Sequence, residues 1–363
     1  MNILGIETSC DETAAAVVKD GNLVLSNVVY TQIPLHKPYG GVVPEIASRA
    51  HIEKISEVVR TALDNFKASY PGEEIDAVAV TYGPGLSPAL IVGVNAAKGL
   101  ALALGKKLIA INHIEAHLHT PFLRDSLDEP ELCPCNFGTA LGLAVSGGHT
   151  AWIDMEGVGQ YRIIGQTLDD AAGEAFDKAA KLLGLGYPGG PKIDKIAKEY
   201  FAAAPHGEKL FPFPKGHPRE GVSSLSGLPA ELCVSFSGLK TALLRFVEKN
   251  GGAEKIAADG ILPKVVASYQ EAIVSVIADR TGKALARKKY SALTVGGGVS
   301  LNSRLRAALA ATAAKHGVAL LTAKPKYCGD NAAMIAALAY YRQNIAGEDA
   351  MNVDVAPSLE IGA

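Results

Sequence analysis

The sequence predicts an α/β protein built from two related lobes. The chain has 363 residues, more than one hydrophobic core usually serves, so two domains or two lobes of one unit are expected. Two segments, 2–18 and 140–153, are variations on one theme: an apolar strand, a turn of small polar residues ending in Thr, and a second apolar strand. After each segment helical and strand-like periodicity alternate, which is typical of α/β architecture.

The composition excludes several classes of protein. The 35 Lys and Arg against 37 Asp and Glu give a net charge of -2, which excludes a strongly basic nucleic-acid wrapper but leaves room for a local basic patch. With 48% hydrophobic and 20% charged residues, the chain is not disordered. The five cysteines are an odd set without CxxC spacing, which indicates neither a disulfide framework nor a zinc knuckle and favours a reducing cytoplasm: Cys10, Cys133, Cys135, Cys233 and Cys328.

Neither a signal peptide nor a membrane span is expected. Residues 1–8 lack a positively charged start and read as a strand interrupted by Glu7. The longest apolar run, 89–105, contains Asn95 and Lys98 and falls short of the roughly 20 residues that a spanning helix needs. We therefore expect a soluble, cytoplasmic protein.

Apolar spacing predicts the elements in order. Residues 45–66 have helical spacing, and 77–81 then read as a buried strand. Ser87 and Pro88 are suited to be the N-cap and first residue of the next helix, which Gly105 ends. Further along, the sequence predicts helices over 264–288, 302–316 and 330–344, strands over 292–295 and 319–323, a turn over 296–298, and a long surface excursion over 205–235.

The sharpest chemical signal is NHIEAHLH at 112–119. Residues four apart share one face of a helix, so His113 and His117 can present two imidazoles to one metal ion. The alternative is that both serve packing or hydrogen bonds. The candidate third ligand is Asp330 in YCGDN, which is equally suited to cap the following helix. A His, His, Asp set with open positions suits Fe(II) or Zn(II).

The position of Glu115 argues against a zinc protease. In the HExxH helix of those enzymes, the Glu beside the first His polarises the attacking water. Glu115 is two residues from each histidine. At about 100° per residue it lies roughly 200° around the helix, away from the side that would face the metal.

Three glycine-rich turns predict a nucleotide cradle, because successive backbone N–H groups bind anions. They are SGGHT at 146–150, YPGGP at 187–191 and VGGGVSLN at 295–302. None matches the P-loop or the GxGxxG fingerprint, and turns without any ligand are the alternative. The helix expected between the first two, within 169–184, carries Asp177, which suits either ribose hydroxyls or a solvated acidic face.

Eight motifs, in order over nearly the whole chain, together resemble the bacterial branch of the universal tRNA threonylcarbamoyladenosine transferase family, the TsaD family. They are ILGIETSCDET (3–13), GGVVPEIASR (40–49), HIEAH (113–117), VSGGHT (145–150), GEAFDKAAKLLGLGYPGG (173–190), SFSGLKT (235–241), GGVSLN (297–302) and CGDN (328–331).

The resemblance implies a two-lobed actin-like ATPase fold, shared with sugar kinases and Hsp70 chaperones. Each mixed-sheet lobe of that fold begins with a phosphate-facing hairpin, and a nucleotide lies in the cleft between the lobes. We expect an N-terminal lobe of 1–125 with 330–363 and a C-terminal lobe of 126–329. The implied reaction moves a threonylcarbamoyl group from threonylcarbamoyl-adenylate to the exocyclic amine of the adenosine next to the anticodon, in tRNAs that read ANN codons, and releases AMP.

The resemblance also implies the site residues. His113, His117 and Asp330 match the metal ligands of the family, with Fe(II) ahead of Zn(II), and threonylcarbamoyl-adenylate or ATP is the implied nucleotide. Ala144 stands where archaeal members have a tyrosine that contacts the metal, so water or substrate would fill that coordination position. An acidic nucleotide contact falls on Asp194, and the other substrate-binding positions fall on Val145, Ser146, Gly147, Gly148, His149, Asp177, Gly190 and Asn302.

In the expected mechanism the metal acts as a Lewis acid on the transferred group. Donors in 146–149 then stabilise the developing oxyanion. Asp11, in the first hairpin turn, shapes the phosphate end or assists proton transfer. Two other functions stay open at this point: a metal-dependent endopeptidase, and a non-catalytic ATP-binding module.

The implied partners are tRNA, the paralogous actin-like protein TsaB, the small P-loop ATPase TsaE and a separate synthase that supplies the adenylate. Helix 45–66 is a reasonable dimerisation surface, although burial within its lobe explains its apolar stripe equally well. Basic side chains that suit tRNA phosphates, but on helices are more often simply solvated, are Lys283, Arg287, Lys288, Lys289, Arg304 and Arg306.

Overall fold

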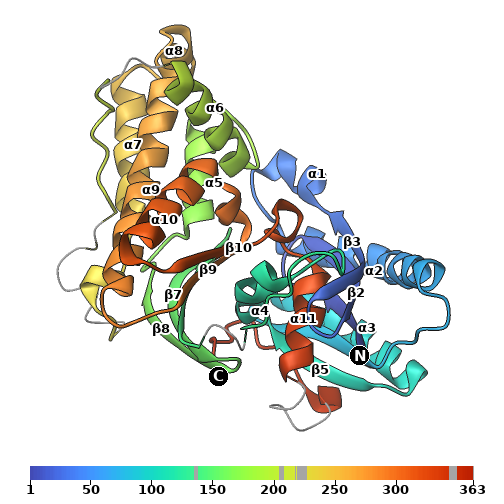
Figure 1. Ribbon diagram of the computed structural model, residues 1–363. Coiled ribbons are helices and arrows are strands. Elements are labelled where there is room, and N and C mark those ends of the chain that lie inside the picture. The colour runs from blue at the N-terminus through green and yellow to red at the C-terminus, as the bar shows by residue number, and fades with distance from the viewer. Residues whose placement is uncertain (135–137, 204–207, 217, 219–226, 343–349, 363) are drawn as a thin grey trace. The chain divides into compact units, whose positions relative to one another are not determined.

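The chain forms two compact units, each built on its own five-stranded sheet (Figure 1). The computed structural model describes residues 1–134, 138–203, 208–216, 218, 227–342 and 350–362. The first unit comprises 1–138, 155–162 and 322–363, and the second comprises 139–154 and 163–321. Both sheets carry helices, which confirms the predicted α/β class with duplicated mixed sheets.

The sheet of the first unit has the order β3-β2-β1-β4-β5. Strands β1, β2 and β3 are antiparallel, whereas β4 and β5 continue the sheet parallel to β1. The predicted first hairpin is therefore present, with Glu7 opposite Ala14 at its closed end. The strands are β1 (Asn2–Glu7), β2 (Glu12–Lys19), β3 (Leu23–Thr31), β4 (Ala77–Gly83) and β5 (Lys107–Asn112).

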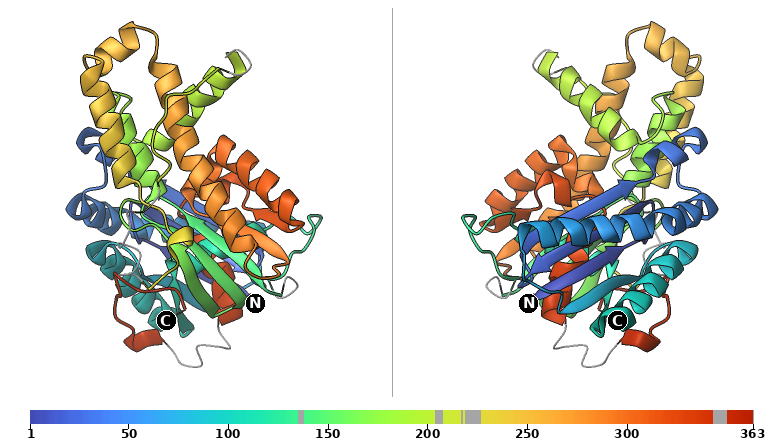
Figure 2. Two further views of the ribbon diagram at one scale, coloured as in Figure 1. Left: turned by 90° about the vertical axis from the view of Figure 1, so that its left-hand side faces the viewer. Right: turned by 90° about the vertical axis from the view of Figure 1, so that its right-hand side faces the viewer.

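Helices cover both faces of this sheet. Leu4 and Ile6 of β1 pack with α2 (Pro44–Ser69) and α3 (Ser87–Leu104), and the right-hand view of Figure 2 shows α2, in blue, across the strands. Ile3, on the opposite face, packs with α11 (Ala332–Arg342). A Cβ atom on Gly5 would lie 2.4 Å from the carbonyl oxygen of Ala332, so the glycine lets α11 approach the sheet backbone closely.

Helix α3 begins one residue earlier than the sequence suggests. The carbonyl of Leu86 accepts hydrogen bonds from Ala89 and Leu90, so Leu86 is the N-cap and the prediction of Ser87 is wrong. Gly105, at φ 62°, ends the helix as predicted. Among the described helices, α3 alone is long and apolar enough to cross a membrane. It packs against the sheet, and Lys98 donates to the carbonyl of Val353 in the C-terminal segment.

The second unit repeats the design. Its sheet has the order β10-β9-β6-β7-β8, with β6 and β9 parallel and the predicted second hairpin formed by the neighbours β6 and β7. Its strands are β6 (Ala140–Val145), β7 (Thr150–Gly157), β8 (Gln160–Gln166), β9 (Ala292–Gly296) and β10 (Ala319–Thr322). Its helices are α5 (Ala172–Leu182), α6 (Gly189–Ala203), α7 (Ser237–Lys249), α8 (Ala253–Ala258), α9 (Leu262–Leu285) and α10 (Ser303–His316).

Short helical elements complete the described chain. The predicted excursion over 205–235 lies partly outside the described residues, and its described part includes η5 (Ala230–Leu232). Cys10, Cys233 and Cys328 are free thiols, whereas Cys133 is disulfide-bonded, a bond that the cysteine spacing did not predict. The other short elements are α1 (Ile33–His36), η1 (Lys37–Tyr39), α4 (His113–His119), η2 (Thr120–Phe122), η6 (Gly298–Leu301), η7 (Pro325–Tyr327) and η8 (Ala350–Asn352).

Candidate functional site

Helix α4 carries His113 and His117 directly after the edge strand β5. Asn112 ends the strand and caps the helix, because its side-chain oxygen accepts hydrogen bonds from the N–H groups of Ile114 and Glu115. All seven residues of α4 are buried. The helix therefore presents its histidines inside the first unit.

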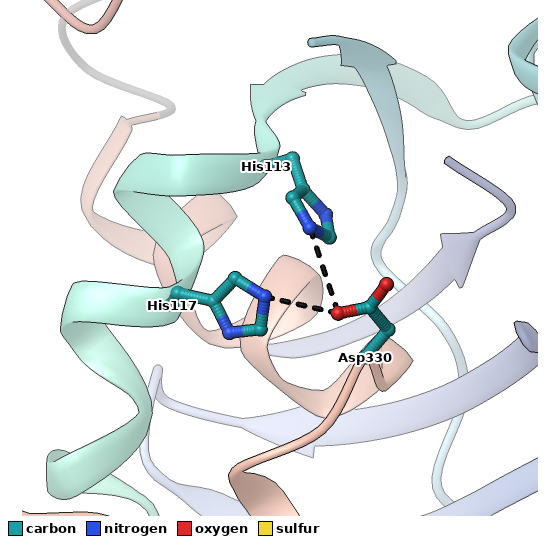
Figure 3. Close-up of side chains that lie close together, drawn as sticks. All are labelled: His113, His117 and Asp330. Atoms are coloured by element: carbon teal, nitrogen blue, oxygen red, sulfur yellow. Dashed lines mark hydrogen bonds and ion pairs between the residues drawn. The ribbon is translucent and has the colours of Figure 1, made fainter. Parts of the chain in front are cut away.

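The structure brings His113, His117 and Asp330 together (Figure 3). Their ligand atoms all lie within 4.8 Å of one another. Asp330 Oδ1 is 3.0 Å from His117 Nε2 and 3.6 Å from His113 Nε2. Two imidazole nitrogens and a carboxylate oxygen are thus close enough to bind one ion, as in a three-ligand metal site with open positions.

Asp330 does not cap the following helix, because its neighbour Asn331 does. Asn331 Oδ1 accepts the N–H of Met334 in the first turn of α11, and the Asn331 amide group also bonds the carbonyl of Tyr327. The capping role is therefore filled by the residue that follows Asp330. This leaves the Asp330 carboxylate directed at the two histidines (Figure 3).

Glu7 contacts the candidate metal site, a contact that the sequence alone did not reveal. Its fully buried carboxylate lies 3.0 Å from Nδ1 of His113, the ring nitrogen opposite the one that faces Asp330. The same carboxylate accepts from Thr81 Oγ1 at 2.6 Å and from the N–H of Ser9 at 2.5 Å. A carboxylate on the far nitrogen of a ligand histidine fixes the ring orientation and raises its basicity.

The buried pair of Glu7 and His113 is strongly polarised. Burial disfavours the charged form of both groups, but their mutual attraction outweighs it. The pKa of Glu7 falls below its ordinary value, and the pKa of His113, also under the influence of Asp330, rises to about 9. In contrast, Nδ1 of His117 is buried and finds no hydrogen-bond partner among the described residues, so internal hydrogen bonding accounts for only one of its ring nitrogens.

Asp11 lies in the turn between β1 and β2, and its residue is 8% exposed. The same turn supplies Ser9, whose hydroxyl is 3.1 Å from His113 Nδ1. The backbone of the turn is held by the hydrogen bond from Gln32 N to Asp11 O. Asp11 is therefore attached to the same hairpin as the histidine partners, although it is not one of the three converging ligands.

In the second unit, the predicted glycine turns lie around the start of α5. The carbonyls of Ser146 and Gly147 accept the N–H groups of Gly173 and Glu174, so the turn 146–149 caps this helix. A Cβ atom on Gly173 would lie 2.7 Å from Gly147 Cα, which is why only glycine fits there. Gly147 and Gly148 themselves are exposed, and a Cβ at either would meet nothing within 4 Å.

Side-chain contacts link this turn to the other predicted positions. Asp177, one turn along α5, accepts the N–H of Gly189 at 2.6 Å and so sets Gly190 in the first turn of α6. Asp194, further along α6, accepts from the N–H and hydroxyl of Ser303.

Asn302 caps α10 by accepting the N–H of Leu305, and it follows the glycine turn 296–298, which contacts the turn 146–149. Its side-chain nitrogen donates to Gln270 at 2.8 Å. The preceding turn packs on β6, since a Cβ on Gly297 would lie 2.4 Å from the carbonyl oxygen of Val145. Contacts thus join the elements that carry the predicted substrate positions of the second unit, the turn 146–149, α5, α6 and the segment 297–303, into a ring.

Comparison with known proteins decides the family. The sequence profile of TsaD, tRNA N6-adenosine threonylcarbamoyltransferase, matches residues 23–337. An enzyme of that name from Anaeromyxobacter dehalogenans (strain 2CP-C) is 50% identical over 358 residues, 98% of each chain. One from Clostridium botulinum (strain 657 / Type Ba4) is 45% identical over 365 residues, which cover 100% of this chain and 98% of the relative.

The chain belongs to the tRNA N6-adenosine threonylcarbamoyltransferase family. Members act in tRNA threonylcarbamoyladenosine biosynthesis, and the reaction transfers a threonylcarbamoyl group to N6 of an adenosine. Because the family function is group transfer to tRNA, the two alternatives, a metal-dependent endopeptidase and a non-catalytic ATP-binding module, are not required to explain the site. Contacts within the first unit agree, because Glu115 bonds Tyr161 and lies 3.8 Å from Arg342 Nε rather than joining the three converging ligands.

Solved structures support the fold of this transferase. HypF from T. kodakarensis aligns with a TM-score of 0.60 over 96% of this chain and 49% of its own, at 13% identity. Component A of the (R)-2-hydroxyglutaryl-CoA dehydratase from Acidaminococcus fermentans aligns with a TM-score of 0.50 over 95% of this chain and 99% of its own, at 16% identity. At such identities the likeness concerns the actin-like fold alone.

The basic residues considered for tRNA binding have partners within the transferase itself. Lys283 pairs with Asp279, and Arg304 makes a bidentate pair with Glu271. Arg287, Lys288 and Arg306 contact Glu231, Asp154 and the carbonyl of Ser300. Phosphate binding would compete with these contacts, and for all six residues the choice between tRNA phosphates and a solvated face stays a prediction.

Proposed function

We propose that this transferase uses threonylcarbamoyl-adenylate as its donor and modifies the adenosine next to the anticodon in tRNAs that read ANN codons. The exocyclic amine attacks the carbamoyl carbonyl carbon, the bond to the adenylate phosphate breaks, and AMP leaves while the amine loses a proton. The observation that carries this proposal is the convergence of His113, His117 and Asp330 in a chain of this family.

We assign these three residues to one divalent metal ion, Fe(II) in preference to Zn(II). The residues fit such an ion: two buried imidazoles and one carboxylate lie within 4.8 Å, and Glu7 supports His113 from behind. Two histidines and one carboxylate with open positions are the donor set of non-haem Fe(II) sites. When bound, such an ion supplies Lewis-acid polarisation of an oxygen of the transferred group.

The chain's own groups then orient the donor and stabilise charge. We assign the nucleotide, threonylcarbamoyl-adenylate or ATP, to the ring of contacts that includes residues 145–149, Gly190 and Asn302, with Asp177 toward the ribose. Gly147 and Gly148 are exposed residues whose N–H groups make no hydrogen bond within the described chain, and these groups suit a developing oxyanion. Asp194 holds Ser303, so its assignment as a nucleotide contact rests on the family alone.

Two assignments concern the edges of this site. Asp11 is assigned to the phosphate end or to proton transfer, since it shares the β1–β2 turn with Ser9, which contacts His113. Ala144 is buried and its side chain has no metal-binding atom; where archaeal members have a tyrosine, this chain would leave that ligand to water or substrate.

For protein partners we infer TsaB, TsaE and an adenylate-forming synthase, all acting in the cytoplasm where tRNA is modified. The outer surface of α2 and α3 is the surface assigned to the paralogous partner TsaB. Ile52 on α2 is 64% exposed and Leu102 on α3 is 70% exposed, and a cavity of about 480 Å³ lies between the helices. Burial of exposed aliphatic side chains of this kind favours association.

The test is transfer of labelled threonine into hypomodified tRNA, with bicarbonate, ATP, the synthase and the bacterial partners, with and without this protein. We expect label in threonylcarbamoyladenosine only when the protein is present, and none with His117→Ala. Absence of label, with the same partners active beside a known family member, would contradict the proposal. Full activity of His117→Ala would contradict its metal-dependent part.

A further inference from the structure

A buried polar cluster lies on the side of α4 opposite the metal-facing histidines. Taking about 100° per residue, Glu115 is about 180° and His119 about 140° from the mean direction of His113 and His117. Glu115 is 2% exposed and His119 is 2% exposed. The proposed function uses neither side chain.

A single hydroxyl group connects the two. Tyr161 Oη lies 2.8 Å from His119 Nε2 and also hydrogen-bonds the Glu115 carboxylate, which in addition accepts the N–H of Gly159. A tyrosine hydroxyl has one proton, so it accepts from His119 Nε2–H while it donates to Glu115. His119 Nδ1 has no partner in the described part of the chain, which agrees with this arrangement of protons.

Arg342, at the end of α11, completes the cluster. Its Nε lies 3.8 Å from Glu115 Oε1, an oxygen without a hydrogen bond among the described residues. Helix α11 also contacts α4 and follows directly after Asp330 and its capping neighbour Asn331. The cluster therefore ties the helix that carries two ligands to the helix that follows the third.

We propose that Glu115 is a positioning residue for the metal centre: held by Tyr161, Gly159 and Arg342, it fixes the rotation of α4 and thereby the direction of both ligand imidazoles. A seven-residue helix has few internal hydrogen bonds to set its own orientation. Asn112 fixes its start, and the cluster fixes its opposite side. This role rests on the metal site of the proposed function.

The test measures Co(II) binding and the visible absorption spectrum of the bound Co(II) in the full chain. The variants are Tyr161→Phe, which removes one oxygen atom, and Glu115→Gln. Asp154→Asn is the matched control, because that buried carboxylate is also held by a tyrosine hydroxyl and a cation, Tyr290 and Lys288, in the other unit. His117→Ala provides the reference for a lost site.

We expect Tyr161→Phe and Glu115→Gln each to weaken Co(II) binding by about tenfold and to change the spectrum of the bound ion. The double variant should bind Co(II) with nearly the same affinity as the single variant of lower affinity, because both substitutions remove the same contact. Asp154→Asn should leave the Co(II) affinity and the spectrum unchanged, even if it lowers the melting temperature as much as Tyr161→Phe or Glu115→Gln does. If Glu115→Gln does not fold, Tyr161→Phe alone decides the matter.

Unchanged Co(II) affinity and spectrum in folded Tyr161→Phe would overturn the positioning role while leaving the proposed function intact. Failure of the metal site itself would give a result that can be told apart from this one. If the unmutated chain does not bind Co(II), or if His117→Ala binds it equally well, the metal assignment fails and the role of Glu115 fails with it.

Discussion

Replacement of Glu7 by Gln tests how the metal site is supported. In the structure the Glu7 carboxylate accepts from three groups: His113 Nδ1, Thr81 Oγ1 and the N–H of Ser9. A Gln side chain of the same shape has only one acceptor oxygen. If that oxygen faces His113, the amide group meets the Ser9 N–H; if it faces Ser9, the amide group meets the ring N–H that a metal-bound His113 presents.

Either orientation leaves buried donors facing each other, and one such mismatch costs about 1–3 kcal/mol. Loss of a carboxylate behind a ligand histidine typically weakens metal binding by about 10–100-fold, or about 1.4–2.8 kcal/mol, which is the same size. We therefore expect Glu7→Gln to raise the dissociation constant for Fe(II) by 10–100-fold and to lower the free energy of unfolding by about 1–3 kcal/mol.

The assay is competition of the protein with a chromophoric chelator, alongside denaturant unfolding of the metal-free chain. The matched control is Glu73→Gln, which removes a half-exposed carboxylate held by Lys19 and Asn2 in the same unit. Because exposed ion pairs add little to stability, that variant should unfold close to wild type and leave metal affinity unchanged. Unaltered metal affinity in folded Glu7→Gln would refute the reasoning about His113.

Three further predictions concern other parts of the molecule. Gly173→Ala places a Cβ 2.7 Å from Gly147 Cα, so it should displace the turn, lower the free energy of unfolding by about 1–3 kcal/mol and raise the KM for the adenylate. Gly238→Ala, with open space around it, should change neither stability nor KM. Steady-state kinetics and denaturant unfolding measure both quantities. Asp125 is partly buried, but hydrogen bonds from two lysines and a tyrosine lower its pKa to about 2, below the ordinary 3.8. Its contribution to stability is therefore present above pH 4 and lost as the pH falls toward 2, so the stability difference between wild type and Asp125→Asn should shrink over that interval of an acid titration. Asp330→Ala should bind no Fe(II) and keep its fold, as elemental analysis and circular dichroism would reveal; a full complement of iron would count against the ligand assignment.

Local patterns carried most of the fold prediction. The duplicated hairpins, the long helices and the glycine that ends α3 follow from periodicity and turn chemistry within a few residues. The prediction was wrong where two adjacent residues could both cap the same helix. Leu86 rather than Ser87 caps α3 because a backbone carbonyl accepts the first helical hydrogen bonds, a choice that residue preferences do not determine.

The cluster of candidate ligands was predictable, and the residues that contact it were not. The i, i+4 spacing of His113 and His117 is visible in the sequence, but Glu7 appears there only as a charged residue at the end of an apolar strand. Its partner is 106 residues away in the chain. A buried charge in a strand could have raised the question, yet only the sheet register directs that carboxylate to His113.

The central claim is metal-dependent threonylcarbamoyl transfer at His113, His117 and Asp330. The most direct measurement is the transfer rate as chelator-treated protein is reconstituted with increasing Fe(II), with the partners and donor in excess. We expect a rate that rises in proportion to bound iron up to one ion per chain, and no recovery for His117→Ala. Full transfer activity in protein freed of metal would contradict it.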